Sequence, residues 1–203
     1  ITKQGERYVS KLFIPTEQCS FFYEDSHSVI WTGGVGGVFK IGSDGEVEQF
    51  FRNKYSITCA IELNGKIYFS TTDATLLIYN SELKYFEEIS SPAIYSGFSY
   101  VAKLSNTQLV LVSQSHGVVG FNTESKLFGE LLWGKDAEFK GDIGISTDKD
   151  QGLWFYNHSG NFWYFNPHSQ RFKKFNLIPN DLIRLIDYER FVVFIDSRNL
   201  IWI

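Results

Sequence analysis

The stretch Gly152–Asn176 reads GLWFYNHSGNFWYFNPHSQRFKKFN and decides the fold. It contains two short aromatic runs, Leu153–Tyr156 and Phe162–Phe165, and a third, half-apolar run, Arg171–Phe175, with polar turns between them. Trp, Phe and Tyr favour the partly buried surface of a sheet, whereas Asn, Gly and Pro interrupt strands. The pattern therefore predicts three successive antiparallel strands joined by tight turns. Strands with this much aromatic surface need neighbours of the same kind to be stable in water.

The dipeptide Phe165-Asn166, which closes the second run, recurs along the chain. Its counterparts, spaced 38 to 44 residues apart, are Phe121-Asn122, Tyr79-Asn80 and Ile41-Gly42. In three copies an aromatic follows the Asn by six residues: Phe172, Phe128 and Phe86. Ten or eleven residues before each dipeptide stand Trp31, Tyr68, Val110 and Trp154. Such agreement between offsets indicates a structural repeat.

Four strands can be placed in each repeat. The expected first strands are Ile57–Leu63, Tyr100–Leu104 and Asp142–Ser146, and the expected fourth strands are Val47–Phe51, Tyr85–Ile89, Leu127–Leu132 and Arg171–Phe175. Four short strands per roughly 40 residues is the size of a β-propeller blade. We predict an all-β propeller of four-stranded antiparallel blades, with four readable blades plus one split or incomplete blade. A β-sandwich is the main alternative, but it gives no reason for fixed offsets.

The N-terminus continues the repeat. Ile1–Glu6 parallels Ile41–Glu46, so we expect the chain to open at the end of a third strand and Arg7–Ile14 to form a fourth, outer strand. The chain contains no Met, which indicates a processed or excised piece. Residues 1–203 are thus expected to be a single β-propeller domain or part of a larger propeller.

The C-terminus allows two alignments with the repeat. If Asn199–Ile203 matches Asn161–Phe165, then Arg7–Ile14 could complete a fifth blade and close the ring. If residues 196–202 (DSRNLIW) match residues 25–31 (DSHSVIW), then Trp202 begins a second strand and the chain stops within a blade. The second match is the closer one.

Composition limits the possible partners. Hydrophobic residues make up 43% and aromatic residues 17% of the 203, and the formal net charge is −4. The sequence has no basic stripe, so nucleic acid and anionic membranes are poor candidate partners. No apolar run is long enough to span a membrane, so any attachment would need segments absent from this chain. Cys19 and Cys59 are expected to be two buried thiols, with a single disulfide as the alternative.

The pattern Asp-x-x-x-x-[Ile/Leu]-Trp, followed by a Gly-bearing turn, an aromatic-Asn pair and a downstream Phe, resembles the two-component regulator propeller repeat. The residues that carry the resemblance include Asp25, Trp31, Asp148 and Trp154. The second and third copies depart from it, because Tyr68 and Val110 replace the Trp and no Asp precedes them by six residues. The resemblance implies the periplasmic sensor region of a hybrid two-component system histidine kinase, built of many such blades and usually binding a glycan fragment.

No cofactor, metal site or catalytic motif is predicted. Gly33–Gly37 lies between two strands and has no following helix to bind phosphate, so it is better explained by a strained turn or bulge. The four histidines form no close pair or Cys-His cluster that would bind zinc. No Gly-x-Ser-x-Gly motif occurs. The chain is therefore not expected to be an enzyme.

Candidate ligand-binding residues lie where the copies differ, on the loops between blades. Two histidines recur in the turn between the second and third strands, which blades present on one common edge: His116 and His158. The long inter-blade loops on the same edge carry residues suited to sugar stacking and hydroxyl binding: Tyr95, Tyr100, Trp133 and Lys135. The structural alternative is that Tyr100 begins an inner strand and that Trp133 caps a blade core.

The leading functional hypothesis is a periplasmic, ligand-sensing region of a bacterial two-component receptor that recognises an oligosaccharide or another small ligand. A propeller enzyme of the lyase or lactonase type is the first alternative. A protein-protein interaction platform, including a homodimer, is the second. The fold alone cannot choose between them, since propellers host all three.

Overall fold

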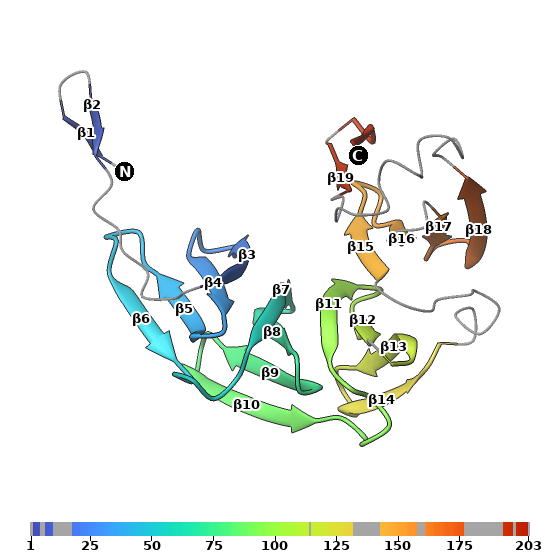
Figure 1. Ribbon diagram of the computed structural model, residues 1–203, viewed down its shortest axis with the longest axis horizontal. Helices are drawn as coiled ribbons and strands as arrows, with labels where there is room; N and C mark the ends of the chain where they lie inside the picture. The colour runs from blue at the N-terminus through green and yellow to red at the C-terminus, as the bar shows by residue number, and fades with distance from the viewer. Residues whose placement is uncertain are drawn as a thin grey trace.

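The computed structural model describes residues 2–4, 7–9, 18–113, 115–131, 143–157, 161–176, 193–196 and 198–202, which form strands and turns and no helix. Four four-stranded antiparallel sheets follow one another along the chain. They stand side by side in an arc, with the first strand of each sheet on the concave side and the fourth on the convex side (Figure 1). The predicted all-β propeller architecture is confirmed.

Each sheet is one blade, and its strands pair in the order of the sequence. Blade one comprises β3 (Cys19–Glu24), β4 (Ile30–Gly34), β5 (Gly37–Ile41) and β6 (Val47–Phe50). Blade two comprises β7 (Ile57–Leu63), β8 (Lys66–Thr71), β9 (Thr75–Asn80) and β10 (Tyr85–Ser90). Blade three comprises β11 (Phe98–Lys103), β12 (Gln108–Ser113), β13 (Gly117–Asn122) and β14 (Leu127–Glu130). Blade four comprises β15 (Ile143–Thr147), β16 (Leu153–Asn157), β17 (Asn161–Asn166) and β18 (Arg171–Asn176).

The recurring aromatic-Asn dipeptide ends the third strand of blades two, three and four. The side-chain oxygen of each Asn accepts two backbone N–H groups of the following turn, at 2.8–3.0 Å: Asn80, Asn122 and Asn166. Asn is frequent in turns because its side chain can form such local hydrogen bonds with the backbone. The aromatic six residues later lies on the fourth strand, directly opposite the aromatic of the dipeptide, as in the pair Phe121 and Phe128.

The Asp-Trp motif is a turn between a first and a second strand, and it occurs three times with the same bonding. One carboxylate oxygen accepts two backbone N–H groups of the turn, and the other accepts the indole N–H: Asp25 with Trp31, Asp148 with Trp154 and Asp196 with Trp202. In blade two the corresponding turn is shorter. It is built on Asn64 and Gly65, which both have positive φ, as a type I′ turn requires.

The C-terminal residues follow the second of the two alignments. β19 (Phe194–Ile195) and β20 (Ile201–Trp202) pair antiparallel across the third Asp-Trp turn. Trp202 therefore belongs to a second strand, and the alternative match of Asn199–Ile203 to a third strand is wrong. The hairpin packs on blade four, where Val193 and Ile201 join the apolar cluster of Tyr156 and Phe162.

The N-terminal prediction was correct only in part. β1 (Thr2–Gln4) pairs with β2 (Arg7–Val9), so a strand stands where the comparison with Ile41–Glu46 predicted a turn. In the blade-one turn the side chain of Asp44 accepts the backbone N–H of Glu46 at 3.0 Å. Gln4 stands at the equivalent position, and its longer side chain does not favour this local bond. A strand begins at Arg7 as expected, and residues 10–14 lie outside the described residues.

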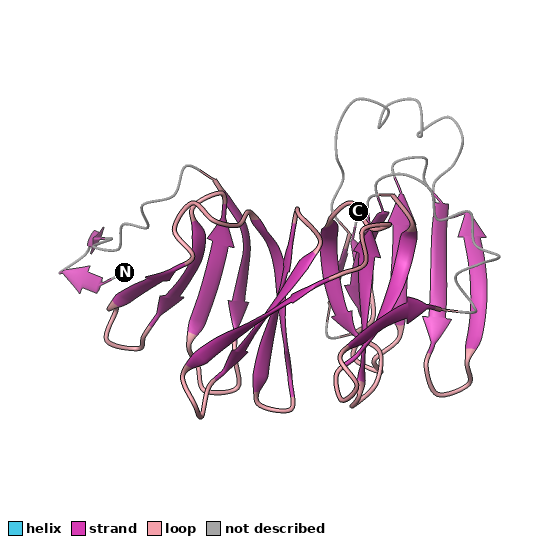
Figure 2. Cartoon of the chain, turned by 90° about the horizontal axis from the view of Figure 1, so that it is seen from below, coloured by secondary structure: helices cyan, strands magenta, loops and turns pink. Residues whose placement is uncertain are grey.

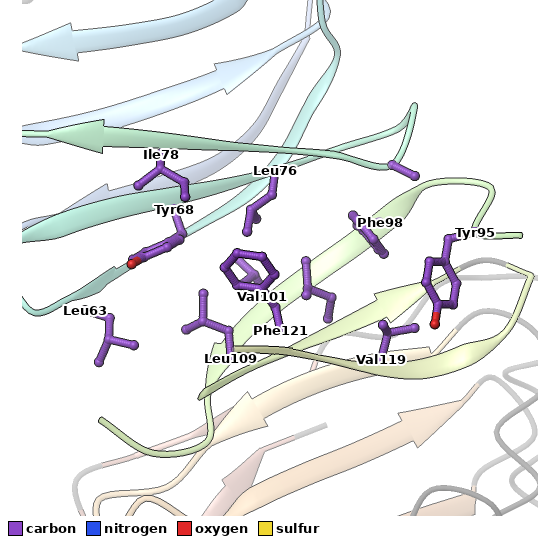
Figure 3. Packing of buried hydrophobic residues seen from close by; sticks show 12 residues of the cluster. Leu63, Tyr68, Leu76, Ile78, Tyr95, Phe98, Val101, Leu109, Val119 and Phe121 are labelled. Atoms are coloured by element: carbon purple, nitrogen blue, oxygen red, sulfur yellow. The ribbon is translucent and has the colours of Figure 1, made fainter. Parts of the chain in front are cut away.

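The core lies between the blades. The cluster between blades two and three shows the pattern: Tyr68, Leu76 and Ile78 of one sheet face Phe98 and Phe121 of the next (Figure 3). Equivalent clusters join blade one to blade two and blade three to blade four. The recurring aromatic residues are therefore explained by contacts between blades.

The two cysteines differ from the expectation. Both are unpaired, so the disulfide alternative is wrong, and Cys19 is exposed where a buried thiol was expected. Cys19 lies at the start of β3, beside a bulge between Cys19 and Phe21. Cys59 is partly covered between blades two and three, and burial raises the pKa of its thiol.

Candidate functional site

The strands run between two opposite edges of the arc, and the turns and loops lie at those edges (Figure 2). One edge carries the turns between second and third strands and the loops between blades. We call residues 72–74, 91–97 and 115–116 of this edge the loop rim. It contains two of the predicted ligand-binding residues, Tyr95 and His116. Their rings meet edge to face, with centroids 5.4 Å apart and planes at 87°.

Ser115 joins the two parts of the loop rim that flank blade three. Its hydroxyl accepts the backbone N–H of Ser96 at 3.1 Å and lies 3.3 Å from the carbonyl oxygen of Ile94. The hydroxyl oxygen of Ser115 also lies 2.7 Å from Nδ1 of His116. These contacts hold the loop before blade three against a turn within that blade, so the exposed side chains of Ile94 and His116 have fixed neighbours.

Blade two holds the same loop from the other side. Ser91 donates its backbone N–H to the carbonyl oxygen of Ala74 at 3.1 Å. Gly97 has a φ of +128°, and a Cβ there would lie 2.4 Å from the carbonyl oxygen of Thr72. Only glycine combines this backbone conformation with so close an approach. The loop rim is thus tied to two blades.

Tyr95 does not offer the ring face that sugar stacking needs. Its side chain is 9% exposed and packs against Phe98 and Phe128 in the cluster between blades two and three. Burial raises the pKa of its phenol. The neighbouring Ile94 is 58% exposed instead. An exposed aliphatic side chain therefore provides the apolar part of this surface, and the ring of Tyr95 packs into the junction between blades two and three.

Tyr100 belongs to a different group of side chains. It lies on β11, is partly buried and packs against the cluster between blades three and four, in agreement with the structural alternative given for it. It hydrogen-bonds with the phenol of Tyr156, whose pKa is raised by burial and which also bonds with Ser146 and the backbone of Val193. Tyr100 therefore joins two blades, and it is not part of the Tyr95–His116 group.

The other three predicted site residues, Trp133, Lys135 and His158, lie outside the described residues, and their roles stay predictions. Gly33–Gly37 forms the tight connection between β4 and β5. Gly37 has a φ of +103°, and a Cβ on Gly34 would lie 1.9 Å from the carbonyl oxygen of Gln18. These glycines serve close backbone packing, as the turn interpretation predicted.

The described residues contain no group of three or more His, Cys, Asp and Glu side chains placed to hold a metal ion. They also contain no helix of the length and apolarity that a membrane span requires.

Known proteins of solved structure share this fold. No protein-family model and no curated protein matches the sequence. The extracellular domain of BT4673 from B. thetaiotaomicron, assigned to a one-component system, matches with a TM-score of 0.70 and 13% identity, over 85% of this chain and 26% of that one. The extracellular domain of BT3049 from the same organism, assigned to a hybrid two-component system, matches with a TM-score of 0.64 and 12% identity, over 83% and 25%.

The same fold is found in a protein of a different kind. A chain of the mitotic checkpoint complex matches with a TM-score of 0.63 and 10% identity, over 87% of this chain and 59% of that one. Identities this low show the fold alone. The chain spans about a quarter of the length of the two bacterial extracellular domains. The resemblance to sensor propellers inferred from the sequence is matched by two of these structural neighbours, and the chain has the fold of a β-propeller.

Proposed function

We propose that this chain is part of the extracytoplasmic, ligand-sensing propeller of a bacterial two-component receptor, and that the loop rim binds an oligosaccharide. The placement outside the cytoplasm, in the periplasm, rests on the likeness to two bacterial extracellular domains of signalling systems. The proposal assigns no catalytic step to the chain.

The observation that supports ligand binding is the composition of the loop rim. Ile94, Ser96, Ser115 and His116 are all exposed, and the hydroxyl of Ser115 contacts the carbonyl oxygen of Ile94, the backbone N–H of Ser96 and the imidazole of His116. A pyranose has the matching character, because its hydroxyls form hydrogen bonds and its C–H faces make apolar contacts. Sites of this kind combine an apolar surface with a few fixed polar groups. Trp133 and Lys135 stay in the proposal as residues predicted from the sequence.

Isothermal titration of the chain against a panel of oligosaccharides tests the proposal. We expect at least one glycan to bind, and His116→Ala and Trp133→Ala each to weaken that binding. Leu83→Ala is the matched control, because Leu83 is exposed in the turn between β9 and β10, at the opposite edge of the arc. No binding from any glycan, or equal weakening by the control, would contradict the proposal.

A further inference from the structure

The imidazole of His116 has two neighbours on the loop rim. Its Nδ1 lies 2.7 Å from the hydroxyl oxygen of Ser115, and its ring meets Tyr95 edge to face. Among the described residues the imidazole makes no other hydrogen bond, and His116 is exposed. Nε2 is therefore the ring nitrogen that a ligand can reach. The tautomer of the ring decides whether Nε2 donates or accepts.

The contacts of Ser115 select that tautomer. Its hydroxyl oxygen accepts the backbone N–H of Ser96 at 3.1 Å and has its own proton to donate. The possible acceptors are Nδ1 of His116 at 2.7 Å, the carbonyl oxygen of Ile94 at 3.3 Å and the hydroxyl oxygen of Ser113 at 3.4 Å. A good O–H donor distance is roughly 2.7–2.8 Å, so the proton is directed to Nδ1. An Nδ1 that accepts leaves the ring proton on Nε2.

The donor at Nε2 does not depend on the charge of the ring. The imidazolium form carries a proton on both nitrogens, so its Nε2 donates as well. The neutral form donates from Nε2 because Ser115 occupies Nδ1. His116 therefore offers a ligand a hydrogen-bond donor in both protonation states.

The loop rim combines this donor with an aliphatic side chain. Ile94 is exposed, and its carbonyl oxygen contacts the same hydroxyl that bonds with His116. Ser115 thus holds both residues through one oxygen atom. A ligand that uses both of them needs a hydrogen-bond acceptor and an apolar group close to each other.

Charge disfavours an anionic acceptor. The described loop rim contains the exposed Asp73 and no Lys or Arg. Tyr95, which contacts His116, has the pKa of its phenol raised first by burial and second by the charge of Glu130. Two acidic side chains therefore belong to these surroundings, and like charges repel. A neutral acceptor suits the described loop rim better than a carboxylate does.

We propose that Ser115 is a positioning residue that holds His116 as an Nε2–H donor, and that the loop rim thereby selects N-acetylated sugars. The N-acetyl group has a neutral carbonyl oxygen, which can only accept, and a methyl group that Ile94 can contact. A sugar hydroxyl has no such methyl group. This inference rests on the proposed function, because it names the class of glycan that the same surface binds.

Nitrogen-15 NMR of the imidazole tests the positioning role without a ligand. Above the ordinary His pKa of about 6.5, we expect His116 to show the Nε2–H tautomer, with well-separated shifts of its two nitrogens. Ser115→Ala should bring the two shifts closer, because both tautomers then exchange. Ser115→Thr keeps the hydroxyl and should restore the separation, and His116→Gln identifies the signal by its loss. A proton on Nδ1, or shifts unchanged in Ser115→Ala, would overturn the role of Ser115.

Isothermal titration with four β-1,4-linked trisaccharides tests the selected group: those of N-acetylglucosamine, glucosamine, glucose and glucuronate. We expect the N-acetylated trisaccharide to bind about tenfold tighter than the other three, the combined effect of one hydrogen bond and one covered methyl group. Ile94→Ala and Ser115→Ala should each reduce this preference. Leu83→Ala, which truncates an exposed aliphatic residue at the opposite edge, should leave it unchanged.

The outcomes separate this inference from the proposed function. Tighter binding of the glucose or glucuronate trisaccharide, weakened by His116→Ala, would overturn the selection of N-acetylated sugars and leave the proposed function intact. No binding of any of the four trisaccharides would overturn the inference too. The proposed function falls only if the wider panel of oligosaccharides also fails to bind.

Discussion

The carboxylate of Asp25 accepts the indole N–H of Trp31 at 2.8 Å, while its other oxygen accepts the backbone N–H groups of His27 and Val29 at 2.9 Å. Trp31 is 1% exposed and packs against blade two. One side chain therefore closes a turn within a blade and orients the aromatic that joins this blade to the next. This double use explains why Asp and Trp recur together at a spacing of six.

Asp25→Asn tests the bond to the indole. An amide oxygen can still accept the two backbone N–H groups, but the amide NH2 would then face the indole N–H, and two donors cannot pair. We expect the free energy of unfolding to fall by about 1–3 kcal/mol, the cost of an unsatisfied buried group. Asp44→Asn, in an exposed turn, is the control. Equal losses in urea denaturation of the two variants would contradict the assigned role.

Phe121→Ala tests whether the blade junctions carry the stability. Phe121 is buried between blades two and three and lies 4.9 Å from Phe128, centroid to centroid. Removing a buried aromatic leaves a cavity, so we expect a loss of about 3–5 kcal/mol. Leu127→Ala changes an exposed residue of the same blade and should stay within about 0.5 kcal/mol of the original chain. A small loss for Phe121→Ala in the same measurement would contradict the claim that the blade junctions carry the stability.

Gly97→Ala tests the packing of the loop rim on blade two. The substitution meets both a positive φ and a carbonyl oxygen 2.4 Å from the new Cβ. Gly65→Ala meets a positive φ but open space, so it measures the conformational cost alone, about 1–2 kcal/mol. We expect Gly97→Ala to lower the melting temperature clearly more than Gly65→Ala. Equal shifts would show that the loop does not need its close approach to Thr72.

Glu88 on β10 provides a pH-dependent link between blade two and the loop that leads into it from blade one. Hydrogen bonds from Lys54 and then Tyr55 hold the pKa of its carboxyl below the ordinary value. A lowered folded-state pKa means that the link stabilises the fold above the ordinary carboxyl pKa and that the effect is lost as the pH falls through the lowered value. The melting-temperature difference between the chain and Lys54→Met should be largest near neutral pH, shrink as the pH falls below the ordinary Glu pKa of about 4.3, and vanish once the pH is below the lowered value. Glu88→Gln should remove the pH dependence of this difference. A difference between the unmodified chain and Lys54→Met that stays constant with pH would contradict the role of Glu88.

The sequence predicted the blade because its strongest signals are local. Asn122 and Asn166 mark turns through bonds to their own neighbours, and the aromatics that follow them are cross-strand partners at a fixed distance. The sequence also showed that the second and third copies lack the Asp-Trp motif. In blade two the Asn64-Gly65 turn takes its place, because two residues with positive φ connect the strands without the longer turn.

The candidate site was predictable only in its location. The shared edge brought Tyr95 to His116, since both lie in connections at the same end of the strands. The sequence could not show that Tyr95 points into a junction while Ile94 points outward, because in an irregular loop no periodicity separates the two faces. Ser115 was missed for a similar reason. Its role depends on contacts with Ile94 and Ser96, which lie about twenty residues away in the chain.

Hydrogen exchange with and without the tightest-binding glycan of the panel tests the central claim most directly. The account predicts slower exchange on binding in residues 91–97 and 115–117, and no change in the turn 81–84 at the opposite edge. Protection confined to the opposite edge, or no protection of the loop rim by a glycan that binds, would contradict the assignment of the loop rim as the sensing surface.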